Sequence, residues 1–123
     1  MTLLVSSVDH KLRAALSGQF KGEKLIFADT SEETELHLLE DKTDILVYDI
    51  DVSKNFTIEA LGVIRKMRPR LPIIVLAEAD EFEKGRQILG LGIFYLLLKP
   101  VPPQTFRTLV ESALNKSKKL KEA

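Results

Sequence analysis

The sequence predicts an α/β fold in which a parallel sheet of five strands is covered by helices on both faces. Two observations lead to this prediction. Short apolar runs without polar alternation, such as Ile45–Tyr48 and Ile73–Ala77, are typical of strands buried on both sides in a parallel sheet. Segments with helical apolar spacing alternate with these runs through short loops, which is the pattern of right-handed βαβ units in a three-layer sandwich.

The amino-terminal part contains the first two strands and a helix between them. Leu3–Val5 is the first apolar run, and Lys24–Ala28 reads as a short second strand. Asp9 is a suitable N-cap for the intervening helix. One face of that helix is apolar, and its members are Leu12, Ala15, Leu16 and Phe20. Gly22 ends the element.

A second helix is expected at Glu32–Asp41, after a turn at Asp29–Ser31. Its acidic first turn suits the positive end of the helix dipole, and Leu36 and Leu39 are expected to face inward. The next strand, Asp44–Asp49, ends in a carboxylate. Open α/β sheets bind ligands at the carboxyl ends of their strands, so Asp49 is placed for chemistry or for an ion pair.

The second half of the chain repeats the alternation. A helix with Ile58, Leu61, Ile64 and Met67 inside is closed by Pro69, and the strand Ile73–Ala77 follows. A helix follows from about Phe82 to Leu89, with C-terminal glycines Gly90 and Gly92. The fifth strand is Phe94–Leu98, which ends at Lys99-Pro100. A last helix starts at Pro102 or Pro103, and its inward residues are Phe106, Leu109, Val110, Ala113 and Leu114.

Composition limits the class of protein. The 123 residues carry 18 Lys and Arg against 18 Asp and Glu, so there is no overall attraction to nucleic acid or to an anionic membrane. The chain has no cysteine, which excludes thiol catalysis and thiolate metal sites. No signal peptide or membrane span is recognisable. We expect a single cytoplasmic domain over residues 1–123, with a basic tail from about residue 115 to 123.

Asp49 ending the third strand, Lys99-Pro100 ending the fifth, and the five-fold alternation together resemble the receiver domain of two-component response regulators. The resemblance covers essentially the whole chain and depends on the order and spacing of these motifs. It implies a flavodoxin-like sheet in the order 2-1-3-4-5 and a role in phosphorelay signalling. It also implies that Asp49 is the phospho-acceptor and that Lys99 is the lysine that pairs with it.

Other functional positions of the receiver pattern are replaced, so the resemblance is to an atypical, degenerate member. Aligning Arg13 with the usual first-helix arginine places Ser7 and Val8 at the acidic pair that holds magnesium. The remaining replacements are Ala77 for the hydroxyl residue of the fourth strand, Leu96 (beside Tyr95) for the aromatic residue of the fifth, and Ser53 for the loop proline.

These replacements bear on cofactors. Hard cations need several oxygen ligands, usually with two or more carboxylates. Asp51 could supply one, since residues i and i+2 of a strand point the same way, and Asp9 could do so if the first loop is one residue longer. We therefore expect magnesium to bind weakly if at all, and no other cofactor.

The predicted role is a protein-interaction module without enzymatic activity. Its partner would be a histidine kinase or another signalling protein, with the face of the fourth helix, fifth strand and fifth helix available for output or homodimerisation. One alternative is a phosphorylation-independent pseudo-receiver. Another is a small ligand binder or enzyme that uses an Asp49–Lys99 pocket. A deep apolar pocket beside Asp49 would favour the binder, whereas a solvent-open aspartate would favour the receiver.

Overall fold

The apolar runs form a five-stranded sheet in which every pairing is parallel. The structure is a computed structural model that describes residues 1–40, 42–50, 55–79 and 84–122. Its elements follow in the order β1 (Thr2–Ser6), α1 (His10–Gln19), β2 (Lys24–Ala28), α2 (Ser31–Leu39), β3 (Ile45–Asp49), α3 (Ile58–Met67), β4 (Ile73–Ala77), α4 (Gly85–Leu89), β5 (Tyr95–Leu98) and α5 (Pro103–Glu122).

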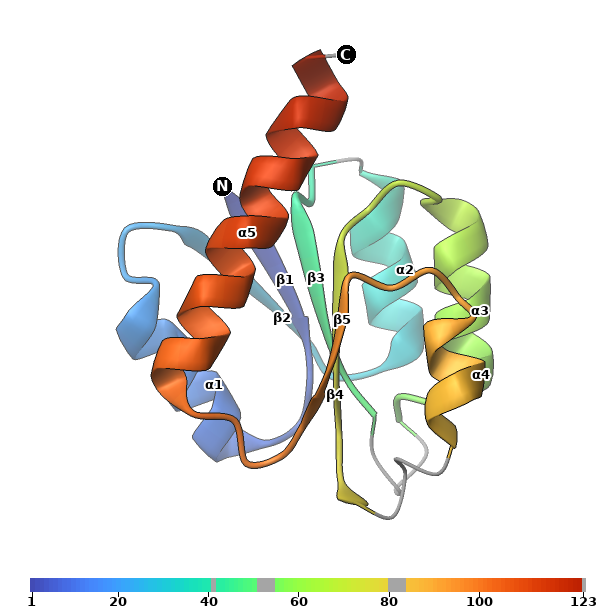
Figure 1. Ribbon diagram of the computed structural model, residues 1–123, viewed down its shortest axis with the longest axis horizontal. Helices are drawn as coiled ribbons and strands as arrows, with labels where there is room; N and C mark the ends of the chain where they lie inside the picture. The colour runs from blue at the N-terminus through green and yellow to red at the C-terminus, as the bar shows by residue number, and fades with distance from the viewer. Residues whose placement is uncertain (41, 51–54, 80–83, 123) are drawn as a thin grey trace.

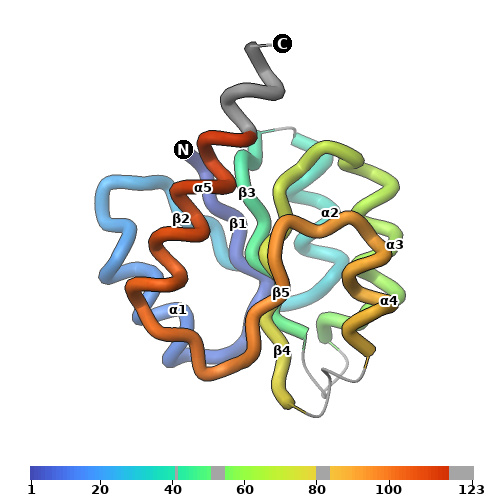
Figure 2. Tube along the Cα trace, in the orientation of Figure 1, coloured from blue at the N-terminus to red at the C-terminus, as the bar shows by residue number. Residues whose placement is uncertain are grey.

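The strands lie in the order β2-β1-β3-β4-β5, which confirms the flavodoxin-like arrangement. Helices α1 and α5 cover one face, and α2, α3 and α4 cover the other (Figures 1 and 2). In the register of the sheet Asp49 pairs with Leu76, and Ala77 pairs with Leu98. The ends of β3, β4 and β5 therefore meet at one edge of the sheet.

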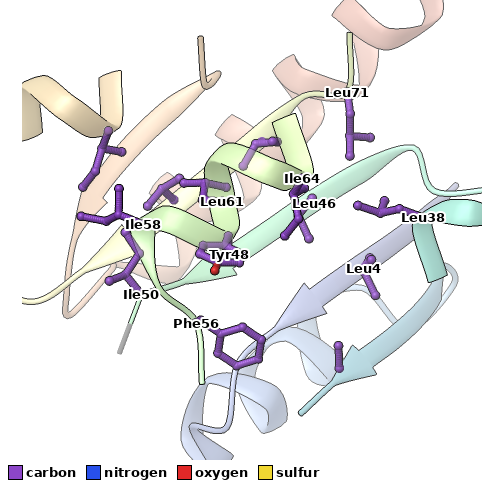
Figure 3. Packing of buried hydrophobic residues seen from close by; sticks show 14 residues of the cluster. Leu4, Leu38, Leu46, Tyr48, Ile50, Phe56, Ile58, Leu61, Ile64 and Leu71 are labelled. Atoms are coloured by element: carbon purple, nitrogen blue, oxygen red, sulfur yellow. The ribbon is translucent and has the colours of Figure 1, made fainter. Parts of the chain in front are cut away.

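Side chains of one strand enter two separate cores, because successive residues point to opposite faces. On the side of α2, α3 and α4, Leu46 and Tyr48 of β3 pack in one buried cluster (Figure 3). Leu38, Leu61 and Ile88 are contributed to it by the three helices. The edge of the Tyr48 ring lies against Phe56, with ring centroids 5.6 Å apart, and its hydroxyl donates to the carbonyl of Thr57 at 2.6 Å.

The opposite core contains the intervening residues of the same strands. Ile45 and Val47 of β3 pack there with Leu16 of α1 and with Phe106 and Val110 of α5. The inward positions of Leu16, Phe20, Phe106, Val110 and Ala113 are thus confirmed. Ala15 was predicted to face inward with them but is exposed, because it lies at the border of the apolar face, beside the cavity next to Lys99. Every side chain of β3 and β4 is buried, which is the burial expected from their continuous apolar sequence.

The prediction for the second helix was wrong about its inward face. Leu36 and Leu39 are 64% and 71% exposed, whereas Ser31, Thr34 and Leu38 are buried. Two of these buried residues are polar and satisfied: the Thr34 hydroxyl is 2.6 Å from that of Ser6, and the Ser31 hydroxyl donates to the carbonyl of residue 55 at 2.7 Å. Hydroxyl groups can be buried when they are hydrogen-bonded. A prediction based only on the spacing of apolar residues therefore placed leucines at positions that Ser31 and Thr34 occupy.

Two further predictions concern the start of the fourth helix and the carboxyl-terminal tail. The predicted fourth helix is described only as Gly85–Leu89, because residues 80–83 lie outside the described residues. The predicted basic tail from about 115 is continuous with α5, while the side chains of its residues 117–123 are outside the description. None of the helices described is long and apolar enough to cross a membrane.

Candidate functional site

Three side chains meet at the carboxyl edge of the sheet because their strands run parallel and end together. Asp49 is the last residue of β3, Lys99 follows β5, and Ser7 follows β1. The Lys99 ammonium lies 2.9 Å from each oxygen of the Asp49 carboxylate and donates its hydrogen bond to Oδ2. Ser7 Oγ donates to the same Oδ2 at 2.6 Å. The predicted contact between Asp49 and Lys99 is confirmed.

Asp49 is only 2% exposed, and its two oxygens are in different situations. Oδ2 accepts from Ser7 and Lys99, whereas the buried Oδ1 has no hydrogen-bond partner among the described residues. Burial raises the pKa of Asp49 above its ordinary value, and the bonds from Ser7 and Lys99 offset only part of this effect. Oδ1 is therefore ion-paired with Lys99 but accepts no hydrogen bond from the described residues.

Asp9 provides a second carboxylate beside the lysine. It is the N-cap of α1, as predicted, and its Oδ1 accepts from the backbone N–H groups of Lys11 and Leu12. Its Oδ2 lies 3.4 Å from Lys99 Nζ. Burial raises the pKa of Asp9, but the Leu12 N–H and the Lys99 charge outweigh it and leave the pKa below its ordinary value.

Lys99 is thus a bridge between two carboxylates. Burial alone would lower its pKa, but the hydrogen bond and charge of Asp49, together with the charge of Asp9, raise the pKa above its ordinary value. The ammonium is consequently held in its charged form. Its side chain is 17% exposed, so the pair is screened little by solvent.

The residues present do not fit a resident magnesium ion. Magnesium needs octahedral oxygen coordination with one or two carboxylates, and here the Lys99 ammonium already forms ion pairs with both Asp49 and Asp9. Among the described residues no group of three or more Asp, Glu or His side chains is placed to hold a metal. Val8 is a 39% exposed apolar side chain, and Asp51 lies outside the described residues.

Ser7 is held in place by Arg13, the residue on which the alignment depends. Arg13 Nε donates to the Ser7 carbonyl at 2.7 Å, and Nη2 pairs with Asp29. Ser7 Oγ also accepts from the backbone N–H of Asp9 at 3.0 Å. The sequence places Ser7 at a lost acidic position and next to Asp49, without a histidine to activate the pair; the signal for their contact is that Ser7 comes immediately after a strand of the same sheet edge.

A cavity of about 350 Å³ opens beside Lys99, between α1 and the Pro100–Val101 segment. Its lining residues are Asp9, Lys11, Leu12, Ala15, Leu76, Glu78, Lys99, Pro100 and Val101. Asp49 does not line it. The cavity does not reach the buried Asp49 carboxylate, so the pocket expected for a ligand binder is not found there. The carboxylate is not open to solvent either, so the exposure expected for a receiver is also not met.

Similarity to a known protein family supports the receiver interpretation. Residues 7–111 match the response regulator receiver domain. The chain belongs to this family. It is accordingly a receiver domain of two-component signalling, a family of signalling modules that interact with histidine kinases.

Individual relatives agree with this assignment. Over 111 residues the receiver is 30% identical to the transcriptional regulatory protein CitT of Bacillus subtilis (strain 168), an alignment that covers 89% of this chain and 49% of CitT. The chain thus spans about half the length of this relative.

Two solved structures show the same fold. A CheY-like receiver domain protein from Methanospirillum hungatei JF-1 has a TM-score of 0.85 at 20% identity, covering 96% of each chain. An adenylate cyclase chain from Rhodopirellula baltica has a TM-score of 0.87 at 13% identity, covering 98% of this chain and 92% of that one. At these identities the likeness shows the fold alone.

Two further positions of this receiver concern transmission of a signal away from Asp49. Ala77, fully buried at the end of β4, has no hydroxyl group, and its carbonyl accepts from the Lys99 N–H at 2.9 Å. Leu96 is partly buried against the α2–α3–α4 core, while the neighbouring Tyr95 is 48% exposed. Ser53, the replacement for the loop proline, lies outside the described residues.

Proposed function

We propose that this receiver acts mainly as a protein-interaction module in a phosphorelay, with Asp49 as its candidate phospho-acceptor. The observation that supports this proposal is the Oδ1 atom of a buried carboxylate: it lies 2.9 Å from the Lys99 ammonium but accepts no hydrogen bond from the described residues, while Oδ2 is fixed by Ser7 and Lys99. A carboxylate oxygen that accepts no hydrogen bond and lies beside a fixed ammonium is suited to act as a nucleophile.

The chemistry follows from the charges. Ionised Oδ1 attacks the phosphorus of a donor, an acyl-phosphate bond forms, and the bond to the donor's leaving group breaks with its electron pair. The transferred oxygens carry negative charge, which would be stabilised by the Lys99 ammonium that lies 2.9 Å from the attacking Oδ1. Because Asp49 is 2% exposed, a donor reaches Oδ1 only after neighbouring side chains shift, so we expect slow transfer.

The interaction surface that we propose is the α4–β5–α5 face. Strand β5 is an edge strand that pairs only with β4, and three large apolar side chains are exposed along α4 and β5: Leu89 at 57%, Tyr95 at 48% and Leu98 at 47%. We expect these side chains to form one apolar patch, since contiguous apolar patches mark sites of protein contact. The face suits a signalling partner, or a second copy of this chain in a homodimer.

Magnesium is expected to play little part. With Ser7 and Val8 at the acidic-pair positions and Lys99 bridging Asp49 and Asp9, we expect no binding at millimolar magnesium. Isothermal titration of the wild type and of Asp49→Asn checks this. Submillimolar affinity that disappears in the variant would contradict it and would indicate Asp9 or Asp51 as the substitute ligand.

The test of the acceptor is incubation with acetyl phosphate and magnesium, followed by intact mass measurement. We expect partial addition of one phosphoryl group to the wild type and none to Asp49→Asn. Equal addition to both proteins would place the modification elsewhere and refute the assignment of Asp49.

A second candidate is a pseudo-receiver that binds partners without phosphorylation. The observation that favours it is the near-complete burial of Asp49 beneath its contacts with Ser7 and Lys99. The same mass measurement separates the two candidates, because a pseudo-receiver gains no phosphoryl group. In both candidates, Asp49→Asn is expected to leave partner binding nearly unchanged.

A further inference from the structure

A second cavity, of about 250 Å³, lies at the amino-terminal edge of the sheet, away from Asp49. It is formed by segments that precede β4 and β5 together with the ends of α3 and α5. These segments come together in the half of the molecule where α5 ends (Figures 1 and 2). Its lining residues are Arg65, Pro69, Arg70, Leu71, Pro72, Gly92, Phe94 and Lys116.

Arg65 is a fixed positive charge in this cavity. Its guanidinium donates to four backbone carbonyls, those of Leu91, Arg68, Pro69 and Gly92, at 3.0–3.1 Å. None of these partners is a carboxylate, and one of the five guanidinium N–H groups remains unused by them. Partial burial lowers the pKa of Arg65, but an arginine stays protonated in proteins, so its charge is not neutralised.

Two more cations line the same cavity without acidic partners among the described residues. Arg70 is exposed, and Lys116 Nζ lies 5.5 Å from the centroid of the Phe94 ring. No Asp or Glu of the described residues lines the cavity. Three positive groups therefore converge on one concave site with no counter-charge supplied by its walls, an arrangement that an anion would stabilise.

The walls also define what kind of anion fits. Pro69, Leu71, Pro72 and Phe94 add apolar groups to the charged lining of the cavity. Its volume is just below the range of roughly 300–1,000 Å³ that holds drug-sized ligands, so only a small molecule fits. Three cations exceed the need of a single carboxylate, whereas a phosphate monoester carries a charge near −2 and three acceptor oxygens.

We propose that this cavity binds a small phosphomonoester. Arg70, Lys116 and the remaining N–H of Arg65 hold the phosphate, and the organic part lies against Leu71 and Phe94. Such a ligand contacts α3, the turn before β5 and α5 at once. It would thus stabilise the relative positions of α3, β5 and α5, two of which belong to the α4–β5–α5 face.

The test is titration of the ¹⁵N-labelled full chain with phenyl phosphate and with inorganic phosphate, followed by amide NMR. Asp49→Asn is used as the background, so that no phosphoryl transfer interferes. We expect saturable shifts at Leu71, Gly92, Phe94 and Lys116. Phenyl phosphate should bind more tightly than inorganic phosphate because its ring contacts the apolar wall.

The matched variants are Arg70→Gln/Lys116→Gln and, as control, Lys66→Gln, which removes an exposed α3 charge outside the cavity. The double variant should weaken phenyl phosphate binding by about tenfold or more, and the control should not change it. Shifts that spread over the whole surface without saturating, or equal affinity in the double variant, would overturn the proposal. Arg65 is left intact because its four carbonyl bonds hold two turns in place.

Discussion

At the scale of single residues, Asp49 combines a functional position with an energetic cost. Its carboxylate is buried, and burial raises its pKa despite the Ser7 and Lys99 contacts. A raised carboxyl pKa means that the folded state binds its proton more tightly than the unfolded chain does. The contribution of this group to stability is complete below its ordinary pKa of 3.8 and is lost as pH rises through the raised folded value.

Replacing Asp49 with Asn should therefore stabilise the fold at neutral pH. The amide keeps the shape and can still bond to Ser7 and Lys99, but it carries no charge. We expect a gain of about 1 kcal/mol, or a Tm higher by roughly 3–6 °C for a domain of this size. Denaturation measured from about pH 4 to pH 8 should show the gap between variant and wild type widening with pH. A gap that narrows would contradict the sign of the Asp49 pKa shift.

Removing the partner should have the opposite effect. Lys99→Met leaves the Asp49 charge buried with only the Ser7 hydroxyl as a donor. Breaking a buried ion pair in this way costs about 3–5 kcal/mol. The double variant Asp49→Asn/Lys99→Met should recover most of that loss in a urea denaturation series. If the double variant is as unstable as Lys99→Met, the lysine acts through packing of its stem and not through its charge.

At the scale of elements, the central strands were the easiest part of the fold to predict. Strands β3 and β4 are buried on both faces, so their sequences are continuously apolar and differ clearly from the flanking polar segments. Helix α2 was predicted with the wrong face inside. Its inward positions include Ser31 and Thr34, whose hydroxyls find partners on β1 and near residue 55, and these partners cannot be located without the tertiary structure.

Helix α2 also provides a direct check on this correction, because two adjacent leucines differ in burial. Leu38 is 2% exposed and packs in the core, whereas Leu39 is 71% exposed. Leu38→Ala should destabilise the protein by about 2–5 kcal/mol, and Leu39→Ala should change its stability by less than about 0.5 kcal/mol. Chemical denaturation of the two variants measures this difference. Equal losses in the free energy of unfolding would support the original prediction that Leu39 faces inward.

The elements that would transmit a signal lack the groups for it. In the receiver pattern, the fourth-strand hydroxyl moves toward the phosphate and the fifth-strand aromatic follows. Ala77 has no hydroxyl to move, and Leu96 already packs against the α2–α3–α4 core. A ligand shifts an equilibrium only through contacts that differ between the two states, and the main such contact is missing here.

At the scale of the whole molecule, the sequence predicted which residues meet at the carboxyl edge better than it predicted their environment. Asp49 and Lys99 were placed together because parallel strands end at the same edge. The approach of Asp9 to Lys99 and the bond from Ser7 to Asp49 depend on the course of the loop after β1, which Arg13 fixes by bonds to Ser7 and Asp29. The burial of Asp49 likewise results from several segments at once.

Two charged sites thus occupy opposite edges of one sheet. In the Asp49–Lys99 site the cation is paired with two carboxylates, while no described acidic residue lines the Arg65–Arg70–Lys116 cavity. The central claim concerns the first of them: occupation of Asp49 has little effect on the α4–β5–α5 face, so partner binding is nearly independent of phosphate.

Amide NMR of the wild type with beryllofluoride, a mimic of the phosphoryl group, and magnesium tests this claim most directly. Asp49→Asn serves as the control that removes the acceptor. We predict shifts confined to the surroundings of Asp49, at Ser7, Ile50 and Lys99, with α4 and α5 unchanged. Shifts that spread through Leu96 into α4 would contradict the account, because they would show a working switch built from other residues.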